Sequence, residues 1–408
     1  MEKKSSNYQS YVVVSIIMLL FGITIATAQY KVPSIMPNIM DQFSMDGGSA
    51  SWLMSIFTFV GIILAIPTGA LAKKFGPKMM LLAAAGVMVI GSIIGAFSGS
   101  GMLLIASRAI EGIALIFVTI SGPLAVQKYI APEKVGSATG IWALWICLGS
   151  VAGGVFTPTL YNLTGFQGVW IIYAALTVVT AIIVALLIKE PGKNLATSIN
   201  EANEAAAALA AEAEPEEKAS YGSLFKPNIL IFLVGWTLFN LVLLAMLAFS
   251  PTFMQSNGVD PTVSGFVSTL PMLLAVISSP LFGALADKTG NVKMLLTIAM
   301  LANGPCAFVL LTNTGPLMWA AAVVMGLVGL GAPVMFITGL FKIIRPEMMA
   351  IGMGFFMLIQ SLGQFLGTAV TPLILGADMS NWMLAGIVVL VLGLIGTVCV
   401  FLARYEVK

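Results

Sequence analysis

The hydrophobic residues of this chain gather into twelve long runs that are separated by shorter polar segments. An α-helix needs about 20 apolar residues to cross the hydrocarbon core of a bilayer, and each run is about that long. The runs cover residues 11–40, 51–72, 79–98, 102–127, 137–160 and 168–188, and then 228–253, 263–286, 294–312, 316–341, 350–375 and 381–403. The pattern predicts an all-α polytopic membrane protein with twelve transmembrane helices.

One long polar stretch, rich in alanine and glutamate, divides these runs into two sets of six. We interpret it as a solvated linker without a part in the chemistry. The sequence thus predicts an N-terminal six-helix bundle over residues 1–188, a cytoplasmic linker over residues 189–227 and a C-terminal six-helix bundle over residues 228–408.

The composition excludes a water-soluble globular enzyme. Of the 408 residues, 59% are hydrophobic and only 9% are charged, against about 25% charged in an ordinary soluble domain. The sequence has no histidine, and its three cysteines lie inside apolar runs, so we expect neither a metal site nor a cofactor. An intramembrane enzyme or sensor would need a cluster of His, Cys or Asp at depth. The absence of a Walker sequence also argues against ATP as the energy source.

The basic residues predict the orientation in the membrane. Seventeen of the 19 lysines and arginines fall in the tails and in the loops on one side, whereas the loops on the other side carry aspartates instead. Basic loops stay in the cytoplasm, so we expect a multi-pass protein of the plasma membrane with both termini cytoplasmic. Four tryptophans open even-numbered runs at the outer end, where an aromatic belt is expected: Trp52, Trp170, Trp319 and Trp382.

The two halves repeat one another at an offset of 214 residues. At this offset Pro37 falls on Pro251, and the segment 69–72 (Gly-Ala-Leu-Ala) falls on the identical segment 283–286. Glycines and prolines of the fifth run match those of the eleventh at the same offset. Parallel repeats of this kind are typical of transporters in which one half rocks against the other.

Two of the repeated segments resemble a known signature. Residues 69–78 (GALAKKFGPK) and 283–290 (GALADKTG) resemble the loop signature of the major facilitator superfamily, and Arg108-Ala109-Ile110-Glu111-Gly112 resembles its fourth-helix motif. The resemblance covers the whole chain and implies two pseudo-symmetric six-helix bundles that alternate access to a central site. It also implies a gating role for the two loops. The residues concerned are Gly69, Lys73, Lys74, Gly76, Lys78, Gly283, Asp287, Lys288 and Gly290.

The first loop departs from the family pattern, because Lys73 stands where the family has an aspartate. Only Asp287, in the second loop, can then take the aspartate's part in the latch that the resemblance implies. The alternative for both loops is a plain cytoplasmic turn whose glycines allow close helix approach.

Three charged residues lie well inside the predicted helices: Lys31, Arg108 and Glu111. A central charge costs about 2.5–3.5 kcal/mol on insertion scales, so each must face water or a partner. Arg108 and Glu111 are spaced to pair on their own helix, which would leave Lys31 without an obvious carboxylate. The competing interpretation is a buried salt bridge without a ligand. Polar residues on the first helix form one face, which we expect to line the cavity, the alternative being hydrogen bonding inside the protein: Thr24, Thr27, Lys31 and Ser34.

These residues suggest a secondary transporter of a small organic or inorganic anion, with proton symport and a bilayer as its surroundings. Lys31 and Arg108 would hold the anion and Glu111 would carry the proton. Further candidates for substrate contact are Thr27, Asn240, Gln360 and Gln364. The alternative is a drug/proton antiporter, although the resemblance is closer to anion and monocarboxylate symporters. We expect a monomer and no nucleic-acid partner.

Overall fold

The computed structural model describes residues 9–131, 134–189, 225–344 and 349–405, and these residues form helices without any strand. The first half contains α1 (Tyr11–Ser34), α2 (Met36–Phe43), α3 (Gly47–Phe75), α4 (Pro77–Ala96), α5 (Gly101–Tyr129) and α6 (Val135–Leu187). The second half contains α8 (Pro227–Ser256), α9 (Pro261–Thr289), α10 (Val292–Thr312), α11 (Pro316–Leu327), η3 (Gly329–Gly331), α12 (Ala332–Ile343), α13 (Met349–Leu375) and α14 (Trp382–Leu402).

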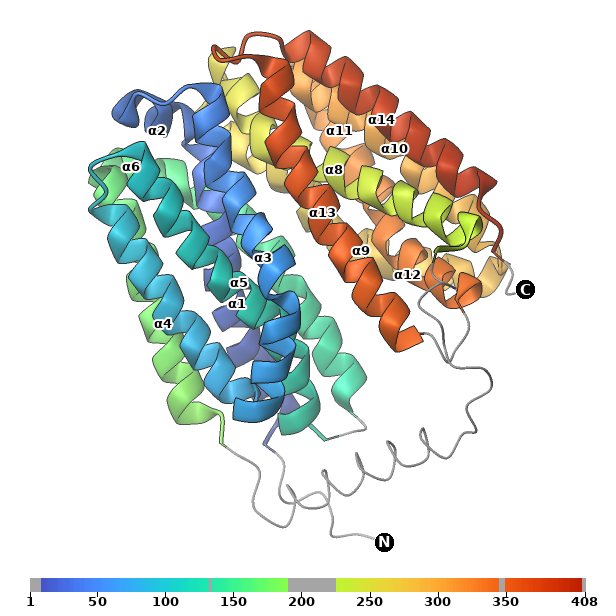
Figure 1. The fold of residues 1–408 in the computed structure, drawn as a ribbon, viewed down its shortest axis with the longest axis horizontal. Helices are drawn as coiled ribbons and strands as arrows, with labels where there is room; N and C mark the ends of the chain where they lie inside the picture. Colours follow the sequence, from blue (N-terminus) through green and yellow to red (C-terminus); the bar gives the residue numbers. More distant parts are fainter. Residues whose placement is uncertain (1–8, 132–133, 190–224, 345–348, 406–408) are drawn as a thin grey trace, which may run out of the picture.

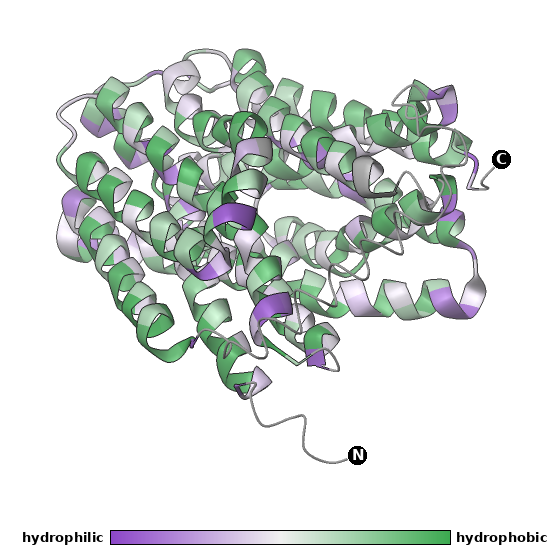
Figure 2. Cartoon of the chain, turned by 60° about the horizontal axis from the view of Figure 1, so that its bottom comes forward, coloured by the Kyte–Doolittle hydropathy of each residue, from purple (hydrophilic) through white to green (hydrophobic). Residues whose placement is uncertain are grey.

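The expected twelve crossings are confirmed by the lengths of these helices. Eleven segments of the described chain are long and apolar enough to cross a membrane. One of them, α6, has 53 residues and turns back at Gly165. The φ angle of Gly165 is 70°, a conformation that glycine adopts readily because it has no side chain. At 1.5 Å per residue it would measure about 80 Å if straight, against about 30 Å of hydrocarbon. It therefore supplies both the fifth and the sixth crossing. Hydrophobic residues dominate the helices (Figure 2).

Two of the predicted helices are interrupted. The first run was expected to continue to residue 40, but α1 ends at Ser34, since Pro33 lies inside its last turn and Ile35 leaves the helical conformation. The tenth run is broken by the short 3₁₀ helix η3, which begins and ends with glycine. Proline and glycine are the usual causes of such breaks.

The helices form two bundles, with the blue-to-green half beside the yellow-to-red half (Figure 1). The predicted linker, residues 189–227, falls mostly on residues 190–224, which lie outside the described residues. Within the bundles, much of the packing joins helices that are distant in sequence, such as α1 with α6, α3 with α5 and α10 with α14, whereas α4 and α5 are neighbours that pack closely.

The two bundles touch at the end of the molecule away from the termini, which we call the closed end. There, the backbone N–H of Gly47 donates to the carbonyl of Ala377 at 3.0 Å. A Cβ atom on Gly265 of α9 would lie 1.9 Å from the carbonyl oxygen of Gly154 in α6, so the two backbones are in direct contact. Toward the other end, which carries both termini, the bundles diverge (Figure 1). Gly69, near that end, has nothing within 4 Å of an added Cβ.

The aromatic belt was expected to place its tryptophans at the membrane surface, and only some of them are exposed there. Trp52 and Trp319 are 45% and 38% exposed, as residues at a membrane interface should be. Trp170 is fully buried instead. Its indole packs on Gly95 of α4, where any Cβ would collide with it. The glycine thus leaves room for a ring that the sequence pattern had assigned to the membrane surface.

Candidate functional site

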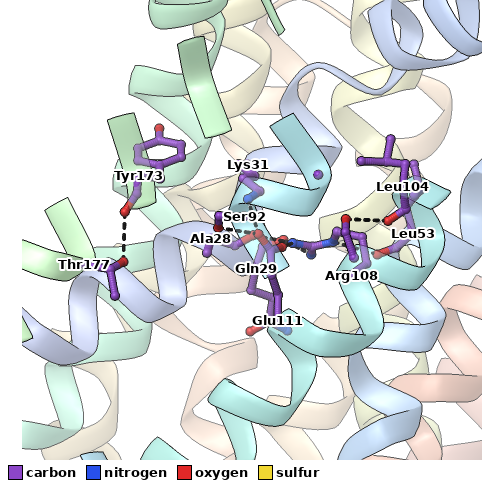
Figure 3. A network of polar contacts seen from close by, with 12 residues as sticks. Ala28, Gln29, Lys31, Leu53, Ser92, Leu104, Arg108, Glu111, Tyr173 and Thr177 are labelled. Atoms are coloured by element: carbon purple, nitrogen blue, oxygen red, sulfur yellow. Dashed lines mark hydrogen bonds and ion pairs between the residues drawn. The ribbon is translucent and has the colours of Figure 1, made fainter. Parts of the chain in front are cut away.

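Three ionisable side chains meet inside the N-terminal bundle (Figure 3). Lys31 comes from α1, and Arg108 and Glu111 come from α5. Nζ of Lys31 lies 2.7 Å from Oε1 of Glu111, and Nη1 of Arg108 contacts the second carboxylate oxygen, Oε2. All three side chains are fully buried. We call these three residues the charged cluster, which carries one net positive charge when every member is ionised.

Arg108 also binds the backbones of two neighbouring helices. Its Nε donates to the carbonyl of Leu53 in α3 at 3.1 Å. Nη1 and Nη2 donate to the carbonyls of Ala28 and Gln29 in α1, at 2.7 and 3.2 Å. The ring of Phe57 covers the guanidinium at 4.2 Å. A lysine could not replace this residue, because its single ammonium cannot reach four acceptors on different sides.

Two residues that the sequence analysis did not assign to the site complete the cluster. Ser92 of α4 donates its hydroxyl to Oε1 of Glu111 at 2.6 Å. The ring of Trp170 in α6 lies 4.3 Å from Nζ of Lys31, a distance typical of a cation–π contact. Gly91, beside Ser92, lets α5 approach, since a Cβ there would lie 2.8 Å from Cγ of Glu111. Small residues allow helices to approach closely, so Gly91 and Ser92 were the signal in the sequence for the contact of α4 with α5.

The expected pairing of Arg108 with Glu111 on their own helix is confirmed. The expectation that Lys31 would lack a carboxylate is wrong, because Glu111 offers one oxygen to each cation. The sharing is possible since α1 packs directly on α5.

Two members of the polar stripe on α1 bind carbonyls of α6. Thr27 donates to the carbonyl of Gly149 and Ser34 to that of Gly153, both at 3.3 Å. For Thr27 and Ser34 these bonds match the alternative of internal hydrogen bonding, while Lys31 contacts Glu111 of α5, so cavity lining by the stripe stays a prediction. Spacing along a helix defines a face but not its partner, and here the glycines of α6 bring that helix against it. A contact of Thr27 with substrate stays a prediction.

The polar candidates of the second half lie on α8 and α13, apart from the cluster. Asn240 is buried and donates to the carbonyl of Trp236 at 2.9 Å, one turn earlier in α8. Gln364 of α13 donates to Oδ1 of Asn240 at 3.5 Å. Gln360 lies one turn away on α13 and is partly exposed. The sequence candidates thus form two groups, one in each half.

The two loops predicted to gate lie near the end with the termini. Gly76 and Gly290 have positive φ angles of 80° and 66°, which explains why glycine occupies both turns. Lys78 donates to the carbonyl of Ala185 at 2.8 Å and so ties its loop to α6. Asp287 is exposed, and the salt bridges among the described residues do not include it. Its latching role stays a prediction. The other charged members are also exposed, namely Lys73, Lys74 and Lys288. Gly283, in the second loop, approaches only Val334 of its own half.

The sequence matches the family model of the Major Facilitator Superfamily over residues 13–368 and again over residues 244–408. The chain belongs to this superfamily. It is therefore a multi-pass membrane transporter, and its two bundles are the halves of a Major Facilitator Superfamily fold.

Solved structures of this superfamily share the fold at low sequence identity. A bacterial homologue of the human lysosomal transporter Spinster, in an inward-facing and occupied conformation, superposes with a TM-score of 0.79 at 16% identity, covering 98% of this chain and 97% of that one. A D-xylose-proton symporter superposes with a TM-score of 0.71 at 14% identity, covering 98% of each chain.

Curated relatives from the superfamily differ in what they carry. The methylenomycin A resistance protein of Bacillus subtilis is 30% identical over 45% of this chain and 40% of its own length. The galactose-proton symporter of Escherichia coli is 31% identical over 36% of this chain and 31% of its own length. A probable sulfoacetate transporter of Cupriavidus necator is 22% identical over 63% of this chain and 61% of its own length. The matches thus span about a third to three fifths of these relatives.

The chemistry open to this superfamily member follows from its side chains. Among the described residues, no group of three His, Cys, Asp or Glu side chains could hold a metal ion. The charged cluster instead offers one carboxylate that can take up a proton and two cations that can hold an anion. Both are equilibrium binding reactions, which is what a secondary transporter requires.

Proposed function

We propose that this transporter carries a small organic or inorganic anion together with a proton, and that the charged cluster couples the two. The observation that carries the proposal is the charge of the cluster. Two fully buried cations, Lys31 and Arg108, share the single carboxylate of Glu111. A buried positive excess is costly unless it is compensated, and an anionic substrate would compensate it.

Proton and anion would promote each other's binding at this cluster. A proton on Glu111 removes the negative charge that both cations face, and an arriving anion takes its place. Conversely, an anion near Lys31 and Arg108 weakens their hold on the ionised carboxylate. Reciprocal coupling of this kind is typically worth about 1–3 kcal/mol.

Lys31 is the better placed of the two cations for contact with a substrate. Among the described residues it donates a single hydrogen bond, to Glu111, although an ammonium group has three donors. Arg108 already serves three backbone carbonyls. We assign Lys31 to the anion, and we propose Asn240, Gln360 and Gln364 as polar contacts from the second half.

We place the protein in the plasma membrane as a monomer with both termini cytoplasmic. The support is the distribution of basic residues, 17 of which fall in the tails and loops that the sequence predicts to be cytoplasmic. In this orientation the closed end faces outward, and the end where the bundles diverge faces the cytoplasm.

A drug/proton antiporter is the second candidate. The methylenomycin A resistance protein, at 30% identity, favours it. Against it stands the charge of the cluster, because a cationic drug would need a free carboxylate, and both oxygens of Glu111 are engaged by cations.

Transport into proteoliposomes distinguishes the two. The purified protein is reconstituted, and uptake is measured with and without an imposed pH gradient for small carboxylates and sulfonates including sulfoacetate, for galactose, and for ethidium as a cationic drug. We expect accumulation of one or more anions when the outside is acidic. Accumulation of galactose or extrusion of ethidium, with no anion carried, would overturn the proposal.

Two variants assign the roles. Lys31→Ala should fold but lose the thermal stabilisation that a carried anion gives the unaltered protein. Glu111→Gln mimics the protonated state, so it should still bind the anion, with weaker dependence on pH, but should no longer concentrate it along a pH gradient. If Glu111→Gln accumulates substrate as the unaltered protein does, Glu111 is only a structural partner of Arg108.

A further inference from the structure

The charged cluster contacts α1 at the point where that helix loses a hydrogen bond of its own. Pro33 lies inside the last turn of α1 and has no N–H, so the carbonyl four residues earlier, that of Gln29, lacks its helical donor. Arg108 supplies the missing donor through Nη2 at 3.2 Å and also binds the adjacent carbonyl of Ala28 at 2.7 Å (Figure 3). The guanidinium thus holds the backbone of α1 at its proline.

The end of α1, one residue after the proline, is held by the opposite half of the protein. Nε2 of Gln255, in α8, donates to the carbonyl of Ser34 at 2.9 Å and lies 3.2 Å from the hydroxyl of Ser264 in α9. The hydroxyl of Ser34 donates back to the carbonyl of Lys31 at 3.0 Å. One turn of helix therefore joins a cluster member to a hydrogen bond that crosses between the halves at the closed end.

We infer that Gln255 and Pro33 are positioning residues, through which the protonation state of Glu111 sets the stability of the closed end. The inference rests on the proposed role of Glu111 in proton coupling. While Glu111 is ionised, it orients Arg108 toward the carbonyls of Ala28 and Gln29, and the last turn of α1 presents Ser34 to Gln255. When Glu111 is protonated, Arg108 loses its anionic partner, the turn at Pro33 relaxes, and the bond to Gln255 is lost.

Glu111 is the one carboxyl group of the charged cluster. Its charged neighbours are Lys31 of α1 and Arg108 of its own helix, while α4 contributes the neutral hydroxyl of Ser92. The aromatic rings that pack on the two cations, Phe57 of α3 and Trp170 of α6, carry no charge. Tyr173 of α6, another titratable group of the bundle, is hydrogen-bonded to Thr157 and not to the cluster.

The direction of this linkage suits an importer driven by protons. If the closed end is stabilised by ionised Glu111, then Glu111 binds a proton more tightly when that end is open, because the linkage is reciprocal. With the closed end facing outward, the outward-open state would take up the proton. The inward-open state would release it to the cytoplasm.

The test measures the opening of the closed end without any substrate. Spin labels are attached to cysteines placed at two exposed positions there, Gln42 and Thr314, after the three native cysteines are replaced by serine. The distance between the labels is recorded from about pH 5 to about pH 8. For the otherwise unaltered protein we expect the ratio of open to closed molecules to fall about tenfold or more over this range, as a coupling of 1–3 kcal/mol allows.

Three variants show whether these residues transmit the protonation state of Glu111 to the closed end or only stabilise that end. Gln255→Ala should flatten the pH dependence of the ratio, whereas a merely structural loss would raise the ratio equally at every pH. Pro33→Ala gives Gln29 a helical donor, so α1 no longer needs Arg108, and the pH dependence should again flatten while the closed end stays closed. Ser256→Ala is the matched control, because its hydroxyl donates to the carbonyl of Phe253 in its own helix and accepts only from the adjacent Asn257 among the described residues.

The inference is overturned if the ratio of open to closed molecules still depends on pH in both Gln255→Ala and Pro33→Ala. It is also overturned if the otherwise unaltered protein shows no pH dependence, or if Ser256→Ala loses it. These results are independent of the transport assay. The distance can respond to pH even if no anion is carried, and anions can be carried with protons even if the closed end ignores pH.

Discussion

The sharing of one carboxylate by two buried cations predicts stability changes of different size for its members. Glu111→Gln leaves Lys31 and Arg108 buried without an anionic partner, since Oε1 and Oε2 each serve one of them. Leaving a buried charge unpaired costs about 3–5 kcal/mol, and we expect a loss of this size. Lys31→Met leaves the neutral pair of Arg108 and Glu111 in place, so its stability should stay within about 1 kcal/mol of the parent.

The measurement is thermal unfolding of the purified variants in detergent, together with the double variant Lys31→Met/Glu111→Gln as the fourth corner of a cycle. The double variant should recover part of the loss, because only one buried cation, Arg108, then remains without an anionic partner instead of two. A bound anion should raise the stability of Glu111→Gln more than that of the parent, since it replaces the missing carboxylate. At a hundred times its Kd an anion adds about 2.7 kcal/mol.

One ordering of the variants would refute this reasoning. If Lys31→Met unfolds at a clearly lower temperature than Glu111→Gln, the carboxylate of Glu111 is not the group that compensates the two buried cations. The positive excess on which the proposed anion site depends would then be wrong.

Two further predictions concern the closed end. Gly265→Ala places a methyl group 1.9 Å from the carbonyl oxygen of Gly154, so we expect it to separate α6 from α9 and to increase the open population in the spin-label measurement; an unchanged distance would contradict the close contact. Asp46 caps α3 by accepting from the backbone N–H of Ser49 at 2.7 Å, and the contacts with Ser49 lower the pKa of its exposed carboxyl. Its contribution to stability should be present above the ordinary pKa of an aspartate and fade as the pH falls through the lowered value, and in Asp46→Ala this part of the pH dependence of the unfolding temperature should be missing.

The fold was predictable because its signals are local. A run of apolar residues has the same meaning wherever its neighbours lie, so the twelve crossings followed from run length alone. The glycines and prolines that recur at one offset identified the two halves. The break after Ser34 was missed, although Pro33 carried the signal, because a long apolar run continues through it.

The site was predictable only in part, since it depends on how helices rotate against one another. The spacing of Arg108 and Glu111 fixed their pairing. The partner of Lys31 depended on the packing of α1 against α5, and the place of Trp170 depended on the space left by Gly95. Ser92 joined the cluster through a contact between separate helices that no sequence spacing describes.

The single surplus positive charge of the cluster also bears on the electrical behaviour of the carrier. Empty, the cluster contains two cations and one anion. Loaded with a proton on Glu111 and a monovalent anion, it again carries one positive charge. Moving one elementary charge across the membrane changes its free energy by about 2.3 kcal/mol per 100 mV. Here the empty and the loaded carrier would have the same charge. Transport of a monovalent anion would therefore follow the pH gradient and ignore the voltage, whereas a divalent anion would move one negative charge per cycle.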